Sequence, residues 1–140
     1  MIVLDTSFVV ALLRADDEGH RAAADFYEKT DRGFSTTPLV LAEIDHLLGS
    51  RSRTPADVGV FHREVRAGTL GVEWWPKLDV QAAEIAERYA GIGLGLTDAT
   101  LVALAARLET TCIATFDERH FRAVEPLAGA AAFTLLPADA

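Results

Sequence analysis

Three acidic residues stand where predicted elements end or begin, and a fourth lies one turn into a helix. Asp5 follows the apolar run at residues 2–4, Asp117 follows residues 112–115, and Asp98 opens an apolar helical segment. Because the carboxyl ends of parallel strands meet at one edge of a sheet, we expect Asp5 and Asp117 there together. Glu43 borders the apolar stripe of its helix instead of facing the solvent side. The positions of these four acids relative to the predicted strands and helices therefore predict that their carboxylates form one cluster.

Such a cluster has a definite chemistry. Each acid alone has an ordinary explanation as a turn or helix-start residue, but Asp5 lies between two apolar runs and is costly to bury unpaired. Gathered like charges repel one another and require cations. Oxygen ligands without cysteine or suitably spaced histidine indicate Mg²⁺ or Mn²⁺, not zinc. A site of this kind suits phosphoryl chemistry, in which a metal activates water and stabilises the departing oxygen.

The elements that must position these acids alternate along the chain. We expect strands at residues 2–4, 34–36, 70–75, 112–115 and 133–136, and helices at 8–14, 19–30, 38–49, 56–67, 79–89 and 98–108. Thr6 or Ser7 is expected to cap the first helix and Thr97 the last. The glycine-rich stretch 91–95 follows a helix and lacks dinucleotide-fingerprint spacing, so it is predicted to be a loop that delivers Asp98. The alternation predicts an α/β layered fold with a mainly parallel sheet.

Length and composition narrow the class of protein. The 140 residues, 50% hydrophobic and 24% charged, predict a single globular domain over 1–140 and exclude disorder or a coiled coil. No apolar run approaches the roughly 20 residues of a membrane span, and the start lacks a signal peptide's basic region. A single cysteine, Cys112, excludes an intramolecular disulfide and a cysteine zinc site. We expect a reducing cytoplasm.

The charged and aromatic residues do not decide whether the chain binds a nucleic acid. The net charge of −8 repels a polyanion at long range, although bound cations would reduce it. Eleven of the 13 basic residues are arginine, whose planar guanidinium group can donate two hydrogen bonds to one phosphate. Of the pair Trp74-Trp75, one is expected in the core while its neighbour points outward to an interface or a base. The four histidines fall on separate elements, and only His120 is near a site acid.

The ordered set of motifs resembles a PIN domain. It comprises Asp5-Thr6-Ser7 after the first strand, Glu43 in a helix led by Thr37-Pro38, Asp98 in Gly-Leu-Thr-Asp-Ala, and Thr115-Phe116-Asp117. More narrowly, the set is similar to the VapC-type toxins of bacterial toxin–antitoxin pairs, over essentially the whole chain. The resemblance implies a PIN-like three-layer sandwich with helices on both sides of the sheet. Arg119-His120-Phe121 is common in that family and is not diagnostic of catalysis.

The resemblance also implies an activity and its residues. It implies a Mg²⁺-dependent endoribonuclease, with Mn²⁺ as a possible substitute, that hydrolyses RNA phosphodiester bonds and is silenced by a VapB-like antitoxin. Asp5, Glu43, Asp98 and Asp117 would form the site, with Asp5 and Asp98 as metal ligands and Thr6 and Thr115 in support. The family is usually dimeric, so a homodimer is expected. The candidates for contacting RNA phosphates are Arg51, Arg53, Arg63 and Arg66.

Two other classes of protein fit parts of the pattern. A phospho-acceptor signalling domain also places acids at strand ends but needs a lysine after a late strand, where neither Lys29 nor Lys77 lies. A non-catalytic PIN-like scaffold that only binds partners is the main alternative, and the presence of all four acids argues against it. The RNA target, the number of metal ions, the antitoxin and direct metal ligation by Asp117 stay open.

Overall fold

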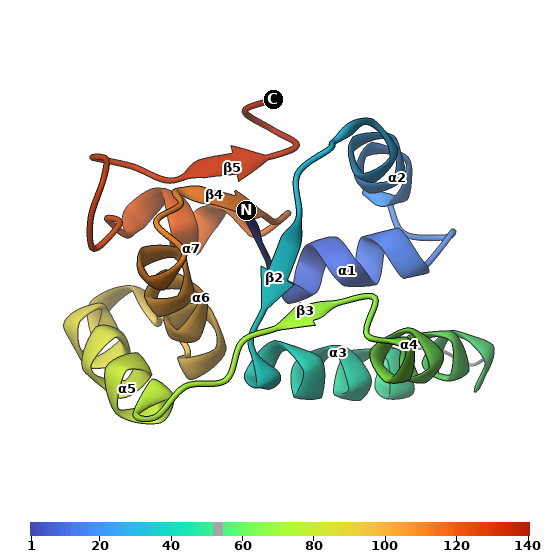
Figure 1. Ribbon diagram of the computed structural model, residues 1–140, viewed down its shortest axis with the longest axis horizontal. Coiled ribbons are helices and arrows are strands. Elements are labelled where there is room, and N and C mark those ends of the chain that lie inside the picture. Colours follow the sequence, from blue (N-terminus) through green and yellow to red (C-terminus); the bar gives the residue numbers. More distant parts are fainter. Residues whose placement is uncertain (52–54) are drawn as a thin grey trace.

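The computed structural model describes residues 1–51 and 55–140 (Figure 1). Its strands are β1 (Ile2–Leu4), β2 (Phe34–Thr36), β3 (Gly71–Val72), β4 (Cys112–Ala114) and β5 (Thr134–Leu136). They form one sheet in the order β3-β2-β1-β4-β5, and each of the four pairings is parallel. β1 is buried at all three positions and lies at the centre of the sheet. The predicted parallel sheet is thus confirmed.

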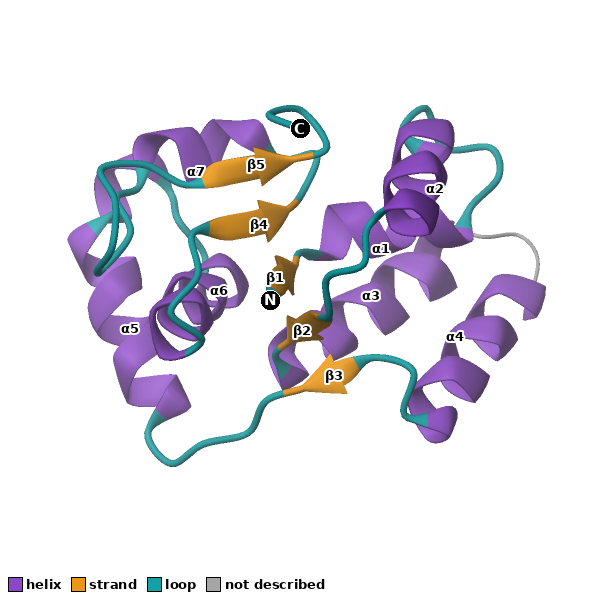
Figure 2. Cartoon of the chain, turned by 45° about the horizontal axis from the view of Figure 1, so that its top comes forward, coloured by secondary structure: helices purple, strands orange, loops and turns teal. Residues whose placement is uncertain are grey.

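Helices cover the sheet from two sides. In Figure 1, the helices coloured blue to green gather on one side and those coloured olive to orange on the other, and Figure 2 shows the same division. The helices are α1 (Thr6–Leu13), α2 (His20–Lys29), α3 (Pro38–Arg51), α4 (Pro55–Ala67), α5 (Leu78–Arg88), α6 (Leu96–Arg107) and α7 (Glu118–Ala123), with a 3-10 turn at Ala90–Ile92. The predicted α/β sandwich with a central sheet is confirmed.

The hydrophobic core contains side chains from the strands and from helices on both sides of the sheet. Phe8, Ile44, Leu101, Ile113 and Leu135 are each fully buried, and they come from α1, α3, α6, β4 and β5. Burying such a side chain stabilises the fold by about 1.5–3 kcal/mol. No helix among residues 1–51 and 55–140 is long and apolar enough to cross a membrane.

The predicted helix caps of α1 and α6 were wrong. Asp5, not Thr6 or Ser7, caps α1, and its side chain accepts a hydrogen bond from the Ser7 backbone N–H. α6 begins at Leu96 with Gly95 as its cap, so Thr97 already lies in the first turn. There the Thr97 carbonyl accepts the hydroxyl of Thr100 at 2.6 Å. Asp5 caps α1 because its negatively charged carboxylate is a stronger hydrogen-bond acceptor at a helix N-terminus than the hydroxyl of Thr6 or Ser7.

Other boundaries also differ from the predictions. α3 continues past Gly49 to Arg51. β3 is limited to Gly71–Val72 because its only neighbour, β2, ends at Thr36, whose carbonyl accepts the Glu73 N–H. Beyond it, Trp75 is half-buried and donates its indole N–H to Gln81, whereas Trp74 is 73% exposed. The expectation of one inward and one outward tryptophan is therefore confirmed.

Candidate active site

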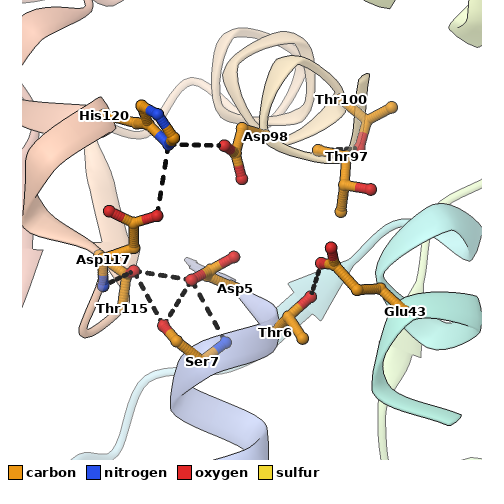
Figure 3. Close-up of polar contacts among 10 residues, drawn as sticks. All are labelled: Asp5, Thr6, Ser7, Glu43, Thr97, Asp98, Thr100, Thr115, Asp117 and His120. Carbon is orange, nitrogen blue, oxygen red and sulfur yellow. Dashed lines mark hydrogen bonds and ion pairs between the residues drawn. The ribbon is translucent and has the colours of Figure 1, made fainter. Parts of the chain in front are cut away.

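A cleft of about 490 Å³ opens where β1 and β4 end and α6 begins (Figure 3). Among the described residues that line it, none is a lysine or an arginine. Its acidic lining residues are Asp5, Asp17, Glu43, Asp98 and Asp117. All four predicted acids therefore lie together, as the strand-end argument requires. Asp17, in the turn before α2, is a fifth acid that was not predicted, because nothing in its local pattern marks it.

Asp5 is the most buried acid of the cleft, with 3% of its surface exposed. Its Oδ2 accepts hydrogen bonds from the hydroxyls of Ser7 at 2.6 Å and Thr115 at 2.7 Å, and from the Ser7 N–H at 3.3 Å. Burial raises the pKa of this carboxyl, and these hydrogen bonds act in the opposite direction. Figure 3 shows the other oxygen turned toward the side of Asp98 and Glu43. One oxygen thus anchors the side chain and leaves the other for the cleft.

The same two hydroxyls tie the chain segments together behind Asp5. Ser7 Oγ accepts the backbone N–H of Phe116 at 2.8 Å, and Thr115 Oγ1 accepts that of Asp117 at 2.9 Å. Both hydroxyl protons go to Asp5, so the 3.1 Å between the two oxygens is a contact within this network. The start of α1 and the segment after β4 are therefore held in one arrangement. Thr115, one of the predicted supporting residues, thus donates to Asp5, and Ser7, which was not predicted, does the same.

Glu43 enters from α3. Thr6, buried in the first turn of α1, donates its hydroxyl to Glu43 Oε2 at 2.5 Å, across 37 residues of sequence. The glutamate itself is half-buried, in agreement with its predicted place at the margin of an apolar stripe. The first turn of α3 is fixed in turn by Thr37, which bonds to Thr100 on α6 at 2.8 Å inside the core. Three helices therefore place one carboxylate.

Asp98 lies in the first turn of α6, with its side chain 18% exposed. Burial is the largest cause that raises its pKa to about 6, and the charges of Asp5, Asp117 and Glu43 add to the rise. The nearby His120 acts against it. A carboxyl so perturbed by desolvation and like charges in a cleft is typical of a functional site. Both desolvation and the neighbouring negative charges therefore favour a protonated Asp98.

His120 of α7 lies beside two of these acids. Its Nδ1 is 3.1 Å from Asp98 Oδ2 and 3.3 Å from Asp117 Oδ2. Asp98, Asp117 and His120 each offer one ligand atom, and these atoms all lie within 4.8 Å of one another. His120 was not predicted to be a site residue. Its spacing of three from Asp117, with both residues at the start of a short helix, is the signal that could have found it.

Two of the arginines proposed for RNA, Arg63 and Arg66, lie in the part of the chain whose side chains the structure describes. Arg63 and Arg66 are exposed on α4, which packs on α3, and neither lines the cleft. The side chain of Arg51 lies beyond what the structure describes, and Arg53 lies outside the described residues altogether. The structure brings the four acids together and leaves the described arginines on a neighbouring surface.

A parallel sheet in this order, with acids from the ends of β1 and β4 and from two helices around one cleft, is the arrangement of a PIN domain. The sequence profile of the PIN domain family matches residues 2–126, so the chain belongs to this family. It is 32% identical over 137 residues to Ribonuclease VapC26 of Mycobacterium tuberculosis (strain ATCC 25618 / H37Rv). That match covers 97% of this chain and 100% of the relative.

Solved structures show the same fold. The crystal structure of VapC20 from Mycobacterium tuberculosis, described as a Sarcin-Ricin loop cleaving toxin, matches with a TM-score of 0.75 and 29% identity. The match covers 84% of this chain and 91% of that one. FitAcB from Neisseria gonorrhoeae, at 19% identity and a TM-score of 0.57, covers 84% of this chain and 88% of that one and supports the fold alone. The family resemblance found in the sequence is confirmed.

Proposed function

We propose that this chain is a divalent-metal-dependent endoribonuclease, the toxin of a VapBC-type toxin–antitoxin pair. The observation that carries the proposal is the gathering of Asp5, Glu43, Asp98 and Asp117 in one cleft at the carboxyl edge of the sheet. Two similar proteins support it, since one is named a ribonuclease and the other is described as a toxin that cleaves the Sarcin-Ricin loop. The substrate class we assign is therefore RNA.

The donor set fits a hard divalent cation. Carboxylate oxygens dominate the cleft, and we assign Mg²⁺, with Mn²⁺ as a substitute, to Asp5 and Asp98. When bound, such an ion supplies an activated water and stabilises the charge on the departing oxygen. The hydroxyls of Ser7 and Thr115 keep the Asp5 carboxylate in one orientation through its Oδ2. Glu43 and Asp117 complete the negative charge that a cation must balance.

The chain's own residues also position the reacting groups. Glu43 Oε2 is engaged by Thr6, and we assign its second oxygen to accept a hydrogen bond from the water that attacks phosphorus in line. An acidic cleft by itself repels a phosphodiester, so the substrate is expected to bind productively only with the cation present. Residues on α4, Arg63 and Arg66, are assigned to the flanking phosphates because they are exposed and cationic.

The proposal includes partners and location. A VapB-like antitoxin is proposed to silence the activity, because similar proteins carry the VapC name. We propose a homodimer for the chain and the cytoplasm as its place of action, where RNA is available. The alternative, a PIN-like scaffold without catalysis, makes the opposite prediction in the experiment below.

The test uses the full chain with total RNA and with a Sarcin-Ricin loop oligonucleotide, in Mg²⁺, in Mn²⁺ and in EDTA. Asp5→Asn and Asp98→Asn are each expected to lower cleavage by at least about 100-fold, the scale of losing one preorganised electrostatic group. The double variant should cost little more, because both act through one site. Asp45→Asn is the matched control, since Asp45 lies on α3, is exposed and pairs with His62. Undiminished cleavage in EDTA or by Asp5→Asn would overturn the proposal, and RNA binding without any cleavage would favour the scaffold.

A further inference from the structure

His120 is oriented by the burial of the residue that follows it. α7 has six residues, and Phe121 anchors it in the core with 1% exposure, in edge-to-face contact with Phe133. Because Phe121 is fixed, the adjacent His120 is turned to the cleft, where it is one of the lining residues. Its side chain is 20% exposed. The imidazole is therefore held at the cleft by packing and is not a free surface group.

The buried ring nitrogen has no hydrogen bond. Nδ1 lies within ion-pair distance of Asp98 and Asp117, but among the described residues it has no hydrogen-bond partner. A buried polar atom without a hydrogen bond is rare and requires an explanation, and a bound ion is one such explanation. This nitrogen sits between two carboxylate oxygens and faces the same space as they do (Figure 3).

The spacing of the three atoms agrees with ligation. Neighbouring ligand atoms of an octahedral ion with bonds of 2.0–2.1 Å lie about 3 Å apart. The two distances from Nδ1, 3.1 and 3.3 Å, match that separation. A neutral imidazole nitrogen is a common metal ligand, and two adjacent carboxylates supply the charge that a divalent cation needs.

We propose that Nδ1 of His120 is a direct ligand of the divalent cation, together with Asp98 and Asp117. This inference rests on the proposed function, because it concerns the cation of the same cleft. Its consequence is a mixed nitrogen and oxygen donor set, which suits Mn²⁺ better than Mg²⁺, since Mg²⁺ prefers oxygen alone. The histidine would then shift the metal preference of this chain toward manganese.

The experiment reads metal binding without using cleavage. Mn²⁺ is bound to the full chain, and electron spin echo modulation reports nitrogen directly coordinated to the ion. The wild type is expected to show ¹⁴N modulation, which changes to the ¹⁵N pattern when the protein is made with ¹⁵N-histidine. His120→Asn, which offers an amide oxygen instead, should lose the modulation. His46→Asn, an exposed histidine on α3, is the matched control and should keep it.

Calorimetric titration adds the affinity. His120→Asn is expected to weaken Mn²⁺ binding by at least about 10-fold, the lower limit seen even for residues that only orient ligands. Mg²⁺ binding should change less.

If Mn²⁺ binds the wild type without nitrogen modulation, or if His46→Asn removes the modulation, the inference is wrong and the proposed nuclease stands. If neither ion binds at millimolar concentration, both the inference and the metal dependence of the proposed function are wrong. If His120→Asn does not fold, the labelled wild type still tests whether a histidine binds the ion, and His120 is the histidine among the described residues that line the cleft.

Discussion

Thr115 donates its hydroxyl to Asp5 at 2.7 Å, although 110 residues separate the two in sequence. The register of the sheet explains the contact. Leu4, the last residue of β1, is paired with Ala114, the last residue of β4, so the residues that follow them, Asp5 and Thr115, lie at the same edge of the sheet. Both side chains are buried. The position of the first acid of the cleft thus depends on the strand that is fourth in the chain.

Replacing Thr115 by valine should expose this dependence. Valine keeps the shape of the side chain but removes the donor, leaving a buried carboxylate short of one hydrogen bond. Hydrogen bonds to charged groups contribute about 1.5–3 kcal/mol, so the free energy of unfolding in urea should fall by roughly that amount. Thr69→Val, at an exposed hydroxyl, is the control and should stay within about 0.5 kcal/mol. Equal losses for the two variants would contradict the assigned role.

The raised pKa of Asp98 predicts how stability depends on pH in the absence of metal. Its folded pKa of about 6 lies above the ordinary 3.8, so between these values the folded chain binds more protons than the unfolded chain. Stability should therefore fall as the pH rises from about 4 to 6, on the order of 2–3 kcal/mol for this group. Asp98→Asn should flatten that decline. Unfolding midpoints in EDTA at several pH values would measure it, and an unchanged slope in the variant would refute the prediction.

Divalent cations should stabilise the fold. A ligand that binds only the folded state adds free energy by mass action, about 2.7 kcal/mol at 100 times its dissociation constant. Millimolar Mg²⁺ or Mn²⁺ should thus raise the melting temperature of the wild type. Asp5→Asn should melt higher than the wild type in EDTA, because burial opposes the charge of Asp5, and should gain less from metal. A melting curve that metal does not move would remove the basis of a shared cation site.

Arg63→Ala with Arg66→Ala should affect RNA binding and not the chemical step. Removing one phosphate-binding arginine lowers the salt dependence of binding to single strands by about 0.7 in the log–log slope. Single-turnover cleavage at saturating RNA should stay close to the wild type. Arg21→Ala with Lys29→Ala removes the same charge from exposed positions of α2 and serves as the control. An identical salt slope for both double variants would exclude a phosphate track on α4.

The expected homodimer can be tested through the mass of the chain in solution. Trp74 is 73% exposed, and Leu96 and Val80 are each about half exposed. Exposed apolar side chains of this size lose contact with water when two copies associate, so we keep the prediction of a homodimer. Light scattering of the full chain at tens of micromolar should give twice the monomer mass of 15.1 kDa. A mass of one chain throughout this range would contradict the dimer.

The strand ends and the four acids could be predicted from the sequence because burial on both faces leaves an uninterrupted apolar run. Residues 2–4 show this, and the acid that follows them marks the edge of the sheet. α7 could not be predicted in the same way, since six residues are too few to establish a helical period. His120 was missed with it. Likewise, β3 is shorter than the strand predicted at residues 70–75, because the end of β2 at Thr36 limits the pairing.

The order of the strands has a consequence for synthesis. β1 lies between β2, which begins at Phe34, and β4, which begins only at Cys112 and is therefore synthesised much later. A nascent chain that ends before Cys112 therefore lacks both Asp117, the last acid of the cleft, and β4 with Thr115, which donates a hydrogen bond to Asp5. Such long-range pairing also forms late in folding. Termination before β4 would thus yield a fragment that lacks the complete acidic cleft.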